Sequence, residues 1–403
     1  MKTNRWIYAI VGVVVLVFAG LIYAWSVLAA PLAAYFTEWS SAQLSMTFTI
    51  CMSAFCIGGV VGGLTNGKWD IKYNVWVSAI LFLVGFVMAS KATSLAMLYI
   101  GYGVLCGLCS GLAYNAVMST MTKWFPDKPG LISGILLMGF GIGAFIIGKV
   151  YQAVTPSGVG VDAWRDSFFV FGIILFAVLA IGGFFFQKPG ADFKVPAAKK
   201  KVAAVQIEGI EATPGVMLRR PAFWCCFFWA VCMCMAALAL ISQATAIAVS
   251  VSPQTAAGTI ATAVGMISVF NGVGRVLFGM LFDRVGLKKT MYCIDGTFLA
   301  AVVFLLMAMF TKQFVILVVG FALIGMSYGG CPTMGSTFIS SFYGTKNYPV
   351  NFSLNNCNLL LASFGSTIAG ALYDASGSYM STMFLLLGAV LVGTVLSLCI
   401  KRP

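Results

Sequence analysis

The chain has 403 residues, of which 61% are hydrophobic and only 9% are charged, and its mean hydropathy is +0.99. Soluble proteins carry roughly 25% charged residues, so this composition excludes an ordinary soluble domain and indicates a protein with many membrane-spanning segments. The net charge of +13 would suit nucleic-acid binding only if the cations clustered, whereas they follow the ends of the apolar segments, so we expect no nucleic-acid partner.

Apolar stretches of about 20 residues, the length at which a helix crosses a bilayer, recur along the whole chain. They predict twelve transmembrane helices, at residues 6–29, 42–64, 74–91, 95–121, 131–154, 166–187, 221–249, 256–282, 290–310, 313–340, 348–373 and 378–400. The first follows Lys2 and Arg5, but it is longer than the roughly 7–15 apolar residues of a secretory signal, so we interpret it as a membrane helix.

A long polar stretch at 188–219 separates six predicted helices from six others. We therefore expect an N-terminal six-helix bundle at 1–187, a cytoplasmic linker at 188–219 and a C-terminal six-helix bundle at 220–403. If both termini are cytoplasmic, nineteen Lys and Arg residues fall on the inner side and three on the outer side. This bias follows the positive-inside rule and predicts a multi-pass protein of the plasma or inner membrane. We expect the lysine run 199–201 to serve topology and solvation, with binding of anionic lipid as the alternative.

Arg275 lies deep inside the predicted helix 256–282, with no carboxylate within one helical turn. A charge at that depth costs ~3 kcal/mol or more, so such residues are usually functional. Because the segment offers no anion, we expect a small bound carboxylate to compensate the charge. Asn271, four residues earlier, shares the same helix face and is expected to donate a hydrogen bond to that ligand.

The stretch from Gly279 to Lys289 matches the signature GxxxD(R/K)xG(x)(R/K)(R/K), by which the chain resembles the major facilitator superfamily. The resemblance implies an all-α fold in which two six-helix bundles enclose a midplane site and rock about it. Asp283 and Arg284 are then expected to hold an inner gate through acid, base and helix-end contacts. The corresponding loop in the first half of the chain has Gly67 where the acid is expected, which predicts weaker contacts at the gate from that loop.

Several further stretches are similar to the bacterial oxalate/formate antiporters and the related monocarboxylate transporters. They are Lys123-Trp124-Phe125-Pro126-Asp127-Lys128, Arg219-Arg220-Pro221-Ala222-Phe223-Trp224 and Lys346-Asn347-Tyr348. In those antiporters a dicarboxylate lies between an arginine and a lysine. The arginine matches Arg275, but the lysine position falls on Asn355, and one cation in place of two favours a monocarboxylate such as lactate or pyruvate.

The resemblance also implies a set of aromatic and apolar substrate contacts. They fall on Tyr23, Leu28, Tyr114, Phe140, Tyr328 and Phe352. A phenol in a dry cavity needs a hydrogen-bond partner, and a carboxylate beside Arg275 would supply one to Tyr114 or Tyr328.

Animal monocarboxylate transporters carry an aspartate at the position of Asn271, which cannot titrate, and the chain has no histidine. We therefore expect the proton to travel on or beside the substrate carboxylate. The remaining acids nearest the membrane are Asp295 and Asp374, both expected at its edges as interfacial or cap residues, with Asp295 as the fallback proton site.

These features predict a secondary transporter of small monocarboxylates that moves them with a proton. A carboxylate exchanger of the oxalate/formate type is the alternative. The sequence shows no nucleotide loop, metal-ligand cluster or activated nucleophile, so we expect neither an enzyme nor a bound cofactor or metal, and we expect the monomer to function alone.

Overall fold

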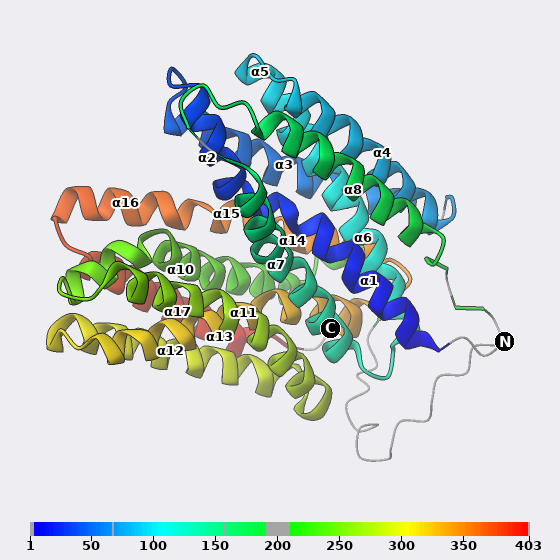
Figure 1. Ribbon diagram of the computed structural model, residues 1–403. Coiled ribbons are helices and arrows are strands. Elements are labelled where there is room, and N and C mark those ends of the chain that lie inside the picture. The colour runs from blue at the N-terminus through cyan, green and yellow to red at the C-terminus, as the bar shows by residue number, and fades with distance from the viewer. Residues whose placement is uncertain (1–3, 67, 157, 188, 191–209, 402–403) are drawn as a thin grey trace. The chain divides into compact units, whose positions relative to one another are not determined.

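The computed structural model describes residues 4–66, 68–156, 158–187, 189–190 and 210–401, and all regular structure in these residues is helical (Figure 1). The helices are α1 (Arg5–Ala19), the 3-10 turn η1 (Gly20–Ala24), α2 (Trp25–Tyr35), α3 (Ser41–Thr65), α4 (Ile71–Ser90), α5 (Leu95–Leu98), the π-helix η2 (Tyr99–Cys106), α6 (Gly107–Trp124), α7 (Pro129–Val154), α8 (Trp164–Gly183), α9 (Pro214–Leu218), α10 (Pro221–Val251), α11 (Ala257–Val285), α12 (Leu287–Thr311), α13 (Phe314–Tyr343), α14 (Tyr348–Asn356), α15 (Asn358–Ala362), α16 (Phe364–Ser376) and α17 (Met380–Cys399).

Within the described residues, eleven helical segments are long and apolar enough to cross a membrane. Each corresponds to one predicted span, and η1 and η2 join their neighbours into the continuous segments Arg5–Tyr35 and Leu95–Trp124. The predicted span 348–373 differs, because it is divided into α14, α15 and α16. None of these three helices reaches the ~20 residues that a membrane-spanning helix needs by itself.

The first break in that segment has a local cause. The side-chain amide of Asn358 donates to the backbone carbonyl of Asn355 at 2.6 Å, at the junction of α14 and α15. An asparagine that satisfies a backbone carbonyl in this way competes with the helical hydrogen-bond pattern. The polar run from Asn355 to Asn358 therefore interrupts a segment whose hydropathy alone predicts one helix.

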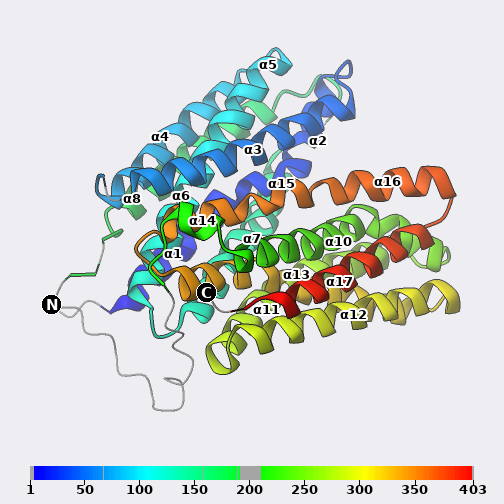
Figure 2. The ribbon, with the colours of Figure 1, turned by 180° about the vertical axis from the view of Figure 1, so that it is seen from behind.

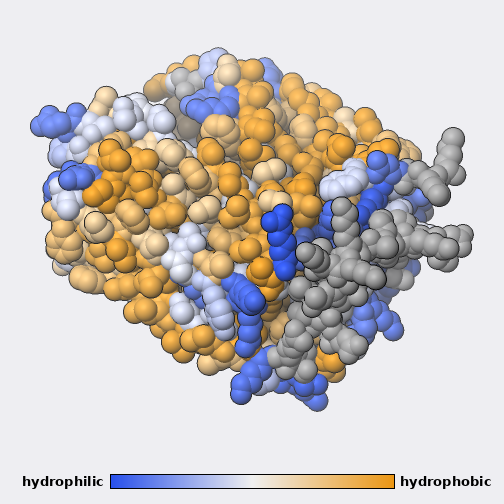
Figure 3. Space-filling view, turned by 90° about the horizontal axis from the view of Figure 1, so that it is seen from below, coloured by the Kyte–Doolittle hydropathy of each residue, from blue (hydrophilic) through white to orange (hydrophobic). Residues whose placement is uncertain are grey.

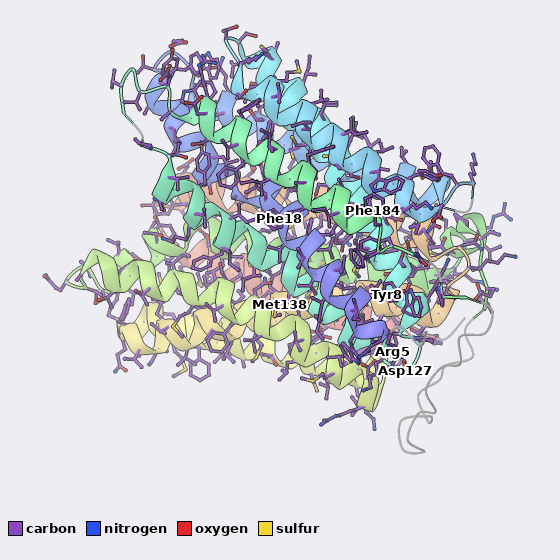
Figure 4. The ribbon with its side chains drawn as sticks, turned by 45° about the vertical axis from the view of Figure 1, so that its right-hand side comes forward. Arg5, Tyr8, Phe18, Asp127, Met138 and Phe184 are labelled. Atoms are coloured by element: carbon purple, nitrogen blue, oxygen red, sulfur yellow. The ribbon has the colours of Figure 1, made fainter. Side chains whose placement is uncertain are left out.

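The chain forms two compact units, which we call unit 1 and unit 2. Unit 1 contains Met1–Pro126, Gly139–Pro196 and Thr345–Leu354, and unit 2 contains Asp127–Met138, Ala197–Gly344 and Asn355–Pro403. A short segment of each half of the chain thus belongs to the unit formed mainly by the other half. Helices α7 and α14 pass from one unit to the other after Met138, labelled in Figure 4, and after Leu354.

Each unit is a set of closely packed helices (Figures 1 and 2). In unit 1, α3 packs against α6 and α4 packs against α8. In unit 2, α13 contacts α10, α11 and α12, and α17 lies against α10 and α12. Helix α13 therefore lies between α11, which carries Arg275, and α12, which carries Asp295.

The exterior carries many exposed large apolar side chains, among them Phe184, Phe310 and Val315. Hydrophobic residues cover much of the face drawn in Figure 3. Soluble proteins rarely expose such area, so these surfaces are suited to lipid. Several cations used to predict the orientation lie outside the described residues, so the cytoplasmic termini and linker stay predictions; they are Lys2, Lys188, Lys194, Lys199, Lys200, Lys201 and Arg402.

Candidate functional site

The Arg275 side chain is half-buried on α11 and is held by neutral oxygens. Its Nε donates to Oδ1 of Asn271 at 2.8 Å, so the two residues share a helix face, and its guanidinium also donates to the backbone carbonyl of Leu137 on α7. The guanidinium forms no ion pair with any carboxylate in the described part of the chain. Its charge is therefore hydrogen-bonded but not neutralised by any carboxylate among these residues.

Two glycines fix the backbone at Arg275. A Cβ atom placed on Gly134 of α7 would lie 2.3 Å from the carbonyl oxygen of Arg275, and one placed on Gly329 of α13 would lie 2.1 Å from the carbonyl oxygen of Asn271 and 2.9 Å from the amide nitrogen of Arg275. The hydroxyl of Thr333 also donates to the Arg275 carbonyl at 3.3 Å. Small residues permit such close helix packing, so α11 is seated between α7 and α13 at the level of the arginine.

The amino-acid sequence alone does not connect Gly134 or Gly329 with Arg275. The spacing of Gly325 and Gly329, four residues apart on one helix face, is the signal that points to a close helix contact. It does not say which helix is contacted, so the connection to Arg275 comes from the structure.

Two other predicted site residues belong to unit 2. Tyr328 is half-buried and directly precedes Gly329 on α13. Asn355 is 1% exposed, and its amide nitrogen lies 2.7 Å from the position of a Cβ on Gly335. The Oδ1 atom of Asn355 has no hydrogen-bond partner among the described residues. A lysine at Asn355 would bring its charge into a closely packed position.

Four predicted aromatic residues meet in unit 1, in what we call the aromatic cluster. The Tyr114 ring lies 4.9 Å from Phe140 and 5.6 Å from Phe352, and Tyr23 meets Phe140 edge-on at 5.5 Å. Phe55, which the sequence analysis missed, completes the cluster at 5.3 Å from Tyr114 and 5.8 Å from Phe140. Such edge and offset contacts add about 0.5–1.5 kcal/mol per pair beyond burial.

Leu28 is buried in unit 1 at 1% exposure, and its backbone carbonyl accepts a hydrogen bond from the Tyr151 hydroxyl at 3.5 Å.

The sequence gives no reason to select Phe55, because it is one of 33 phenylalanines in the chain. Its membership of the aromatic cluster depends on how α3 and α6 pack.

Asp283, predicted as a gate residue, binds the N-terminus of α7. Its Oδ1 accepts from the amide of Gly130 and its Oδ2 accepts from the amide of Leu131, both at 2.8 Å. A carboxylate there satisfies orphan amides and interacts favourably with the positive end of the helix dipole. Arg284 is exposed. A gating role for both stays a prediction.

A neutral side chain contacts the part of α14 that belongs to unit 1. The side-chain amide of Asn115 on α6 donates to the carbonyl of Pro349 at 2.6 Å and to the hydroxyl of Ser353 at 2.7 Å, both on α14. Gly67, which stands at the missing acid, lies outside the described residues. The Asn115 amide therefore helps to hold the segment that unit 1 takes from the second half of the chain.

Asp295 is 2% exposed and lies inside α12, more than one turn from either end, so the alternative that it caps a helix was wrong. Its position relative to the membrane interface stays a prediction. Its Oδ1 accepts from Nε1 of Trp229 on α10 at 2.8 Å, and its Oδ2 accepts from the hydroxyl of Ser397 on α17 at 2.6 Å. Asp374 is exposed on α16.

The long apolar helices of the two units define a helical, multi-pass membrane protein. The family model for the Major Facilitator Superfamily matches residues 10–366 and 252–403, so the chain belongs to this superfamily. The solved structure of FucP in the outward conformation covers 98% of this chain and 99% of its own at a TM-score of 0.71 and 15% identity, and that of the XylE symporter covers 99% and 97% at 0.72 and 14%.

Curated relatives are also transporters. An uncharacterised MFS-type transporter of Escherichia coli, YhjX, is 26% identical over 354 residues, which are 88% of this chain and 84% of the relative. The oxalate:formate antiporter of Oxalobacter formigenes is 26% identical over 359 residues, covering 86% and 80%. Mouse monocarboxylate transporter 12 is 30% identical over 122 residues, covering 30% and 24%. The resemblance inferred from the sequence motifs is confirmed.

Proposed function

We propose that this chain is a proton-coupled symporter of small monocarboxylates such as lactate and pyruvate, working by alternating access. Arg275 binds the substrate carboxylate, and Asn271 orients the guanidinium and donates a second hydrogen bond. The observation that carries the proposal is the Arg275 charge, which has two neutral acceptors and no carboxylate partner in the described residues.

The state of Asn271 supports this role. Its Oδ1 already accepts from Arg275, so its amide hydrogens are the part of the side chain that a ligand can use. A guanidinium beside an amide donor presents several N–H groups toward one anion, an arrangement suited to bidentate recognition of a carboxylate.

Charge counting supports a monocarboxylate. Asn355 stands where the antiporters carry a second cation, and it is buried and uncharged. A dicarboxylate would leave one carboxylate without a partner in a site of low dielectric constant, at a large cost. A monocarboxylate with a short apolar end avoids this cost, and the aromatic cluster, Tyr328 and Leu28 are the residues proposed to contact that end.

The test is counterflow of radiolabelled lactate in proteoliposomes that contain only this protein. We expect robust counterflow by the wild type and none by Arg275→Gln, with Arg275→Lys recovering little because a point charge does not reproduce the planar fork. Thermal stability of each detergent-solubilised variant serves as the control for folding. Wild-type counterflow by a stable Arg275→Gln protein would refute the assignment.

A second candidate is a carboxylate exchanger, which the 26% identity to an oxalate:formate antiporter over most of the chain favours. The two functions differ in their response to pH. A symporter accumulates lactate when the outside is acidified, whereas an obligate exchanger needs an internal counter-substrate and does not respond to the gradient alone.

A further inference from the structure

The Asp295 carboxylate is buried and held by neutral side chains. It accepts two hydrogen bonds from neutral donors, Trp229 at 2.8 Å and Ser397 at 2.6 Å, and it forms no ion pair with a described residue. Both donors are themselves buried, with 0% and 1% exposure. An ionised carboxylate in a membrane helix is costly, so such a residue needs a partner or a proton.

The hydroxyl of Ser397 has two acceptors within reach. Its oxygen lies 2.6 Å from Oδ2 of Asp295 and 2.8 Å from the backbone carbonyl of Thr394, one turn earlier on α17. When Asp295 is ionised, Ser397 donates to the carboxylate. When Asp295 carries a proton on Oδ2, that proton is donated to the Ser397 oxygen, and Ser397 donates to Thr394 instead.

Trp229 needs no such reversal. Its N–H donates to Oδ1, which accepts a hydrogen bond in the carboxylate and in the carboxylic acid alike. Every polar atom of the group therefore keeps a partner in both protonation states. A merely structural buried aspartate requires partners for one state, whereas this arrangement suits a group that gains and loses a proton.

The titratable side chains around Asp295 are thiols. Cys331 on α13 lies near the carboxylate, and Cys226 and Cys234 on α10 lie near Cys331. On α17 the facing group is the Ser397 hydroxyl. The cations of α11, Arg275 and Arg284, form no ion pair with Asp295.

Helix α13 connects this carboxylate to Arg275 by direct packing. Gly329 lies against the backbone of Asn271 and Arg275 on α11, while a Cβ on the next residue, Gly330, would lie 2.7 Å from the side chain of Ile294, which precedes Asp295 on α12. A Cβ on Gly330 would also lie 2.8 Å from the side chain of Phe278 on α11, so these adjacent glycines bring α13 close to both α11 and α12. The carboxylate and the arginine therefore belong to helices that pack closely against the same stretch of α13.

We propose that Asp295 binds the co-transported proton, at a site separate from Arg275, with Ser397 as its switching hydrogen-bond partner. The proposal rests on the proposed symport function and names the group that carries its proton. Burial and the two-state hydrogen bonding favour Asp295 over the substrate carboxyl group, which the sequence alone had favoured.

The experiment compares two activities of the full-length protein in proteoliposomes, lactate counterflow at equal pH and lactate accumulation driven by an acid exterior. With one proton per lactate, a gradient of about one pH unit supports about tenfold accumulation. Asp295→Asn preserves both hydrogen bonds, because its amide donates to Ser397 as the protonated acid does. We expect it to lose the accumulation entirely while retaining counterflow.

Two variants sharpen the result. Asp374→Asn alters an exposed carboxylate on α16 and should leave accumulation unchanged. Ser397→Ala keeps the carboxyl group but removes the switch, so it should shift the external pH of half-maximal uptake. Wild-type accumulation by Asp295→Asn, or equal loss of both activities by a stable Asp295→Asn protein, would overturn the proposal. Absence of lactate counterflow in the wild type would instead refute the proposed function, in which lactate is a transported substrate.

Discussion

A methyl group on Gly329 should disrupt substrate binding without touching a polar side chain. In Gly329→Ala the new Cβ would lie 2.1 Å from the Asn271 carbonyl oxygen and 2.9 Å from the Arg275 amide nitrogen. Both are backbone atoms, so no side chain can rotate away. Reaching an ordinary contact of 3.4 Å requires α11 and α13 to separate locally by about 1.3 Å, the difference between the two distances.

That separation displaces the guanidinium from its acceptors. The hydrogen bonds from Arg275 to Asn271 and to the Leu137 carbonyl depend on where α11 lies. Overpacking of this kind costs about 1–3 kcal/mol, and the gain of ~1 kcal/mol in helix propensity from glycine to alanine offsets part of it. We expect lactate counterflow to fall at least about tenfold, equivalent to ~1.4 kcal/mol, with a smaller loss of thermal stability.

The matched control is Gly272→Ala on α11, where the nearest atom to the new methyl group is the flexible Cγ of Met138 at 3.4 Å. This substitution brings the same helix propensity to a neighbouring position without a backbone clash. Initial rates are normalised to the amount of inserted protein. If Gly329→Ala matched Gly272→Ala in rate and stability, the close contact would not position Arg275, and this reasoning would fail.

Two further predictions concern charge at named contacts. Asn355→Lys restores the second cation of the antiporters and should raise the affinity for oxalate relative to lactate, measured by competition in counterflow; an unchanged ratio in a folded variant would place Asn355 away from the substrate. Asp283→Ala removes the acceptor of the Gly130 and Leu131 amides, costing about 0.5–2 kcal/mol, so hydrogen exchange at Leu131 should accelerate about 2–30-fold while Arg284→Gln has no effect. Equal protection in all three proteins would contradict the contact.

Hydropathy predicted where helices occur, because a membrane helix must bury every backbone polar group within itself and covers its surface with apolar side chains. Hydropathy is averaged over a window of residues, and this average did not reveal the break in the segment 348–373. Asn355 and Asn358 are two polar residues in a long apolar window, and what interrupts the helix is a single side-chain hydrogen bond between them. A window average does not register such a contact.

Local spacing predicted local geometry. Asn271 and Arg275 are four residues apart, and their hydrogen bond follows from helix geometry. Burial against other helices could not be predicted in this way. Asp295 and Phe55 look peripheral or ordinary in sequence, because hydropathy gives the depth of a residue in a membrane but not the direction in which its helix face points. Their partners come from helices that are distant in the chain.

Arg275 and Asp295, a cation and an anion in unit 2, are not paired with each other. Arg275 on α11 and Asp295 on α12 each have neutral hydrogen-bond partners and no opposite charge among the described residues. Pairing them would neutralise both but would remove the binding role that we propose for each. Unpaired, the arginine is available for the proposed carboxylate and the aspartate for the proposed proton. The net charge of the two residues is zero when both are empty and stays zero when both are loaded, so the proposed symport moves no net charge through this part of the protein.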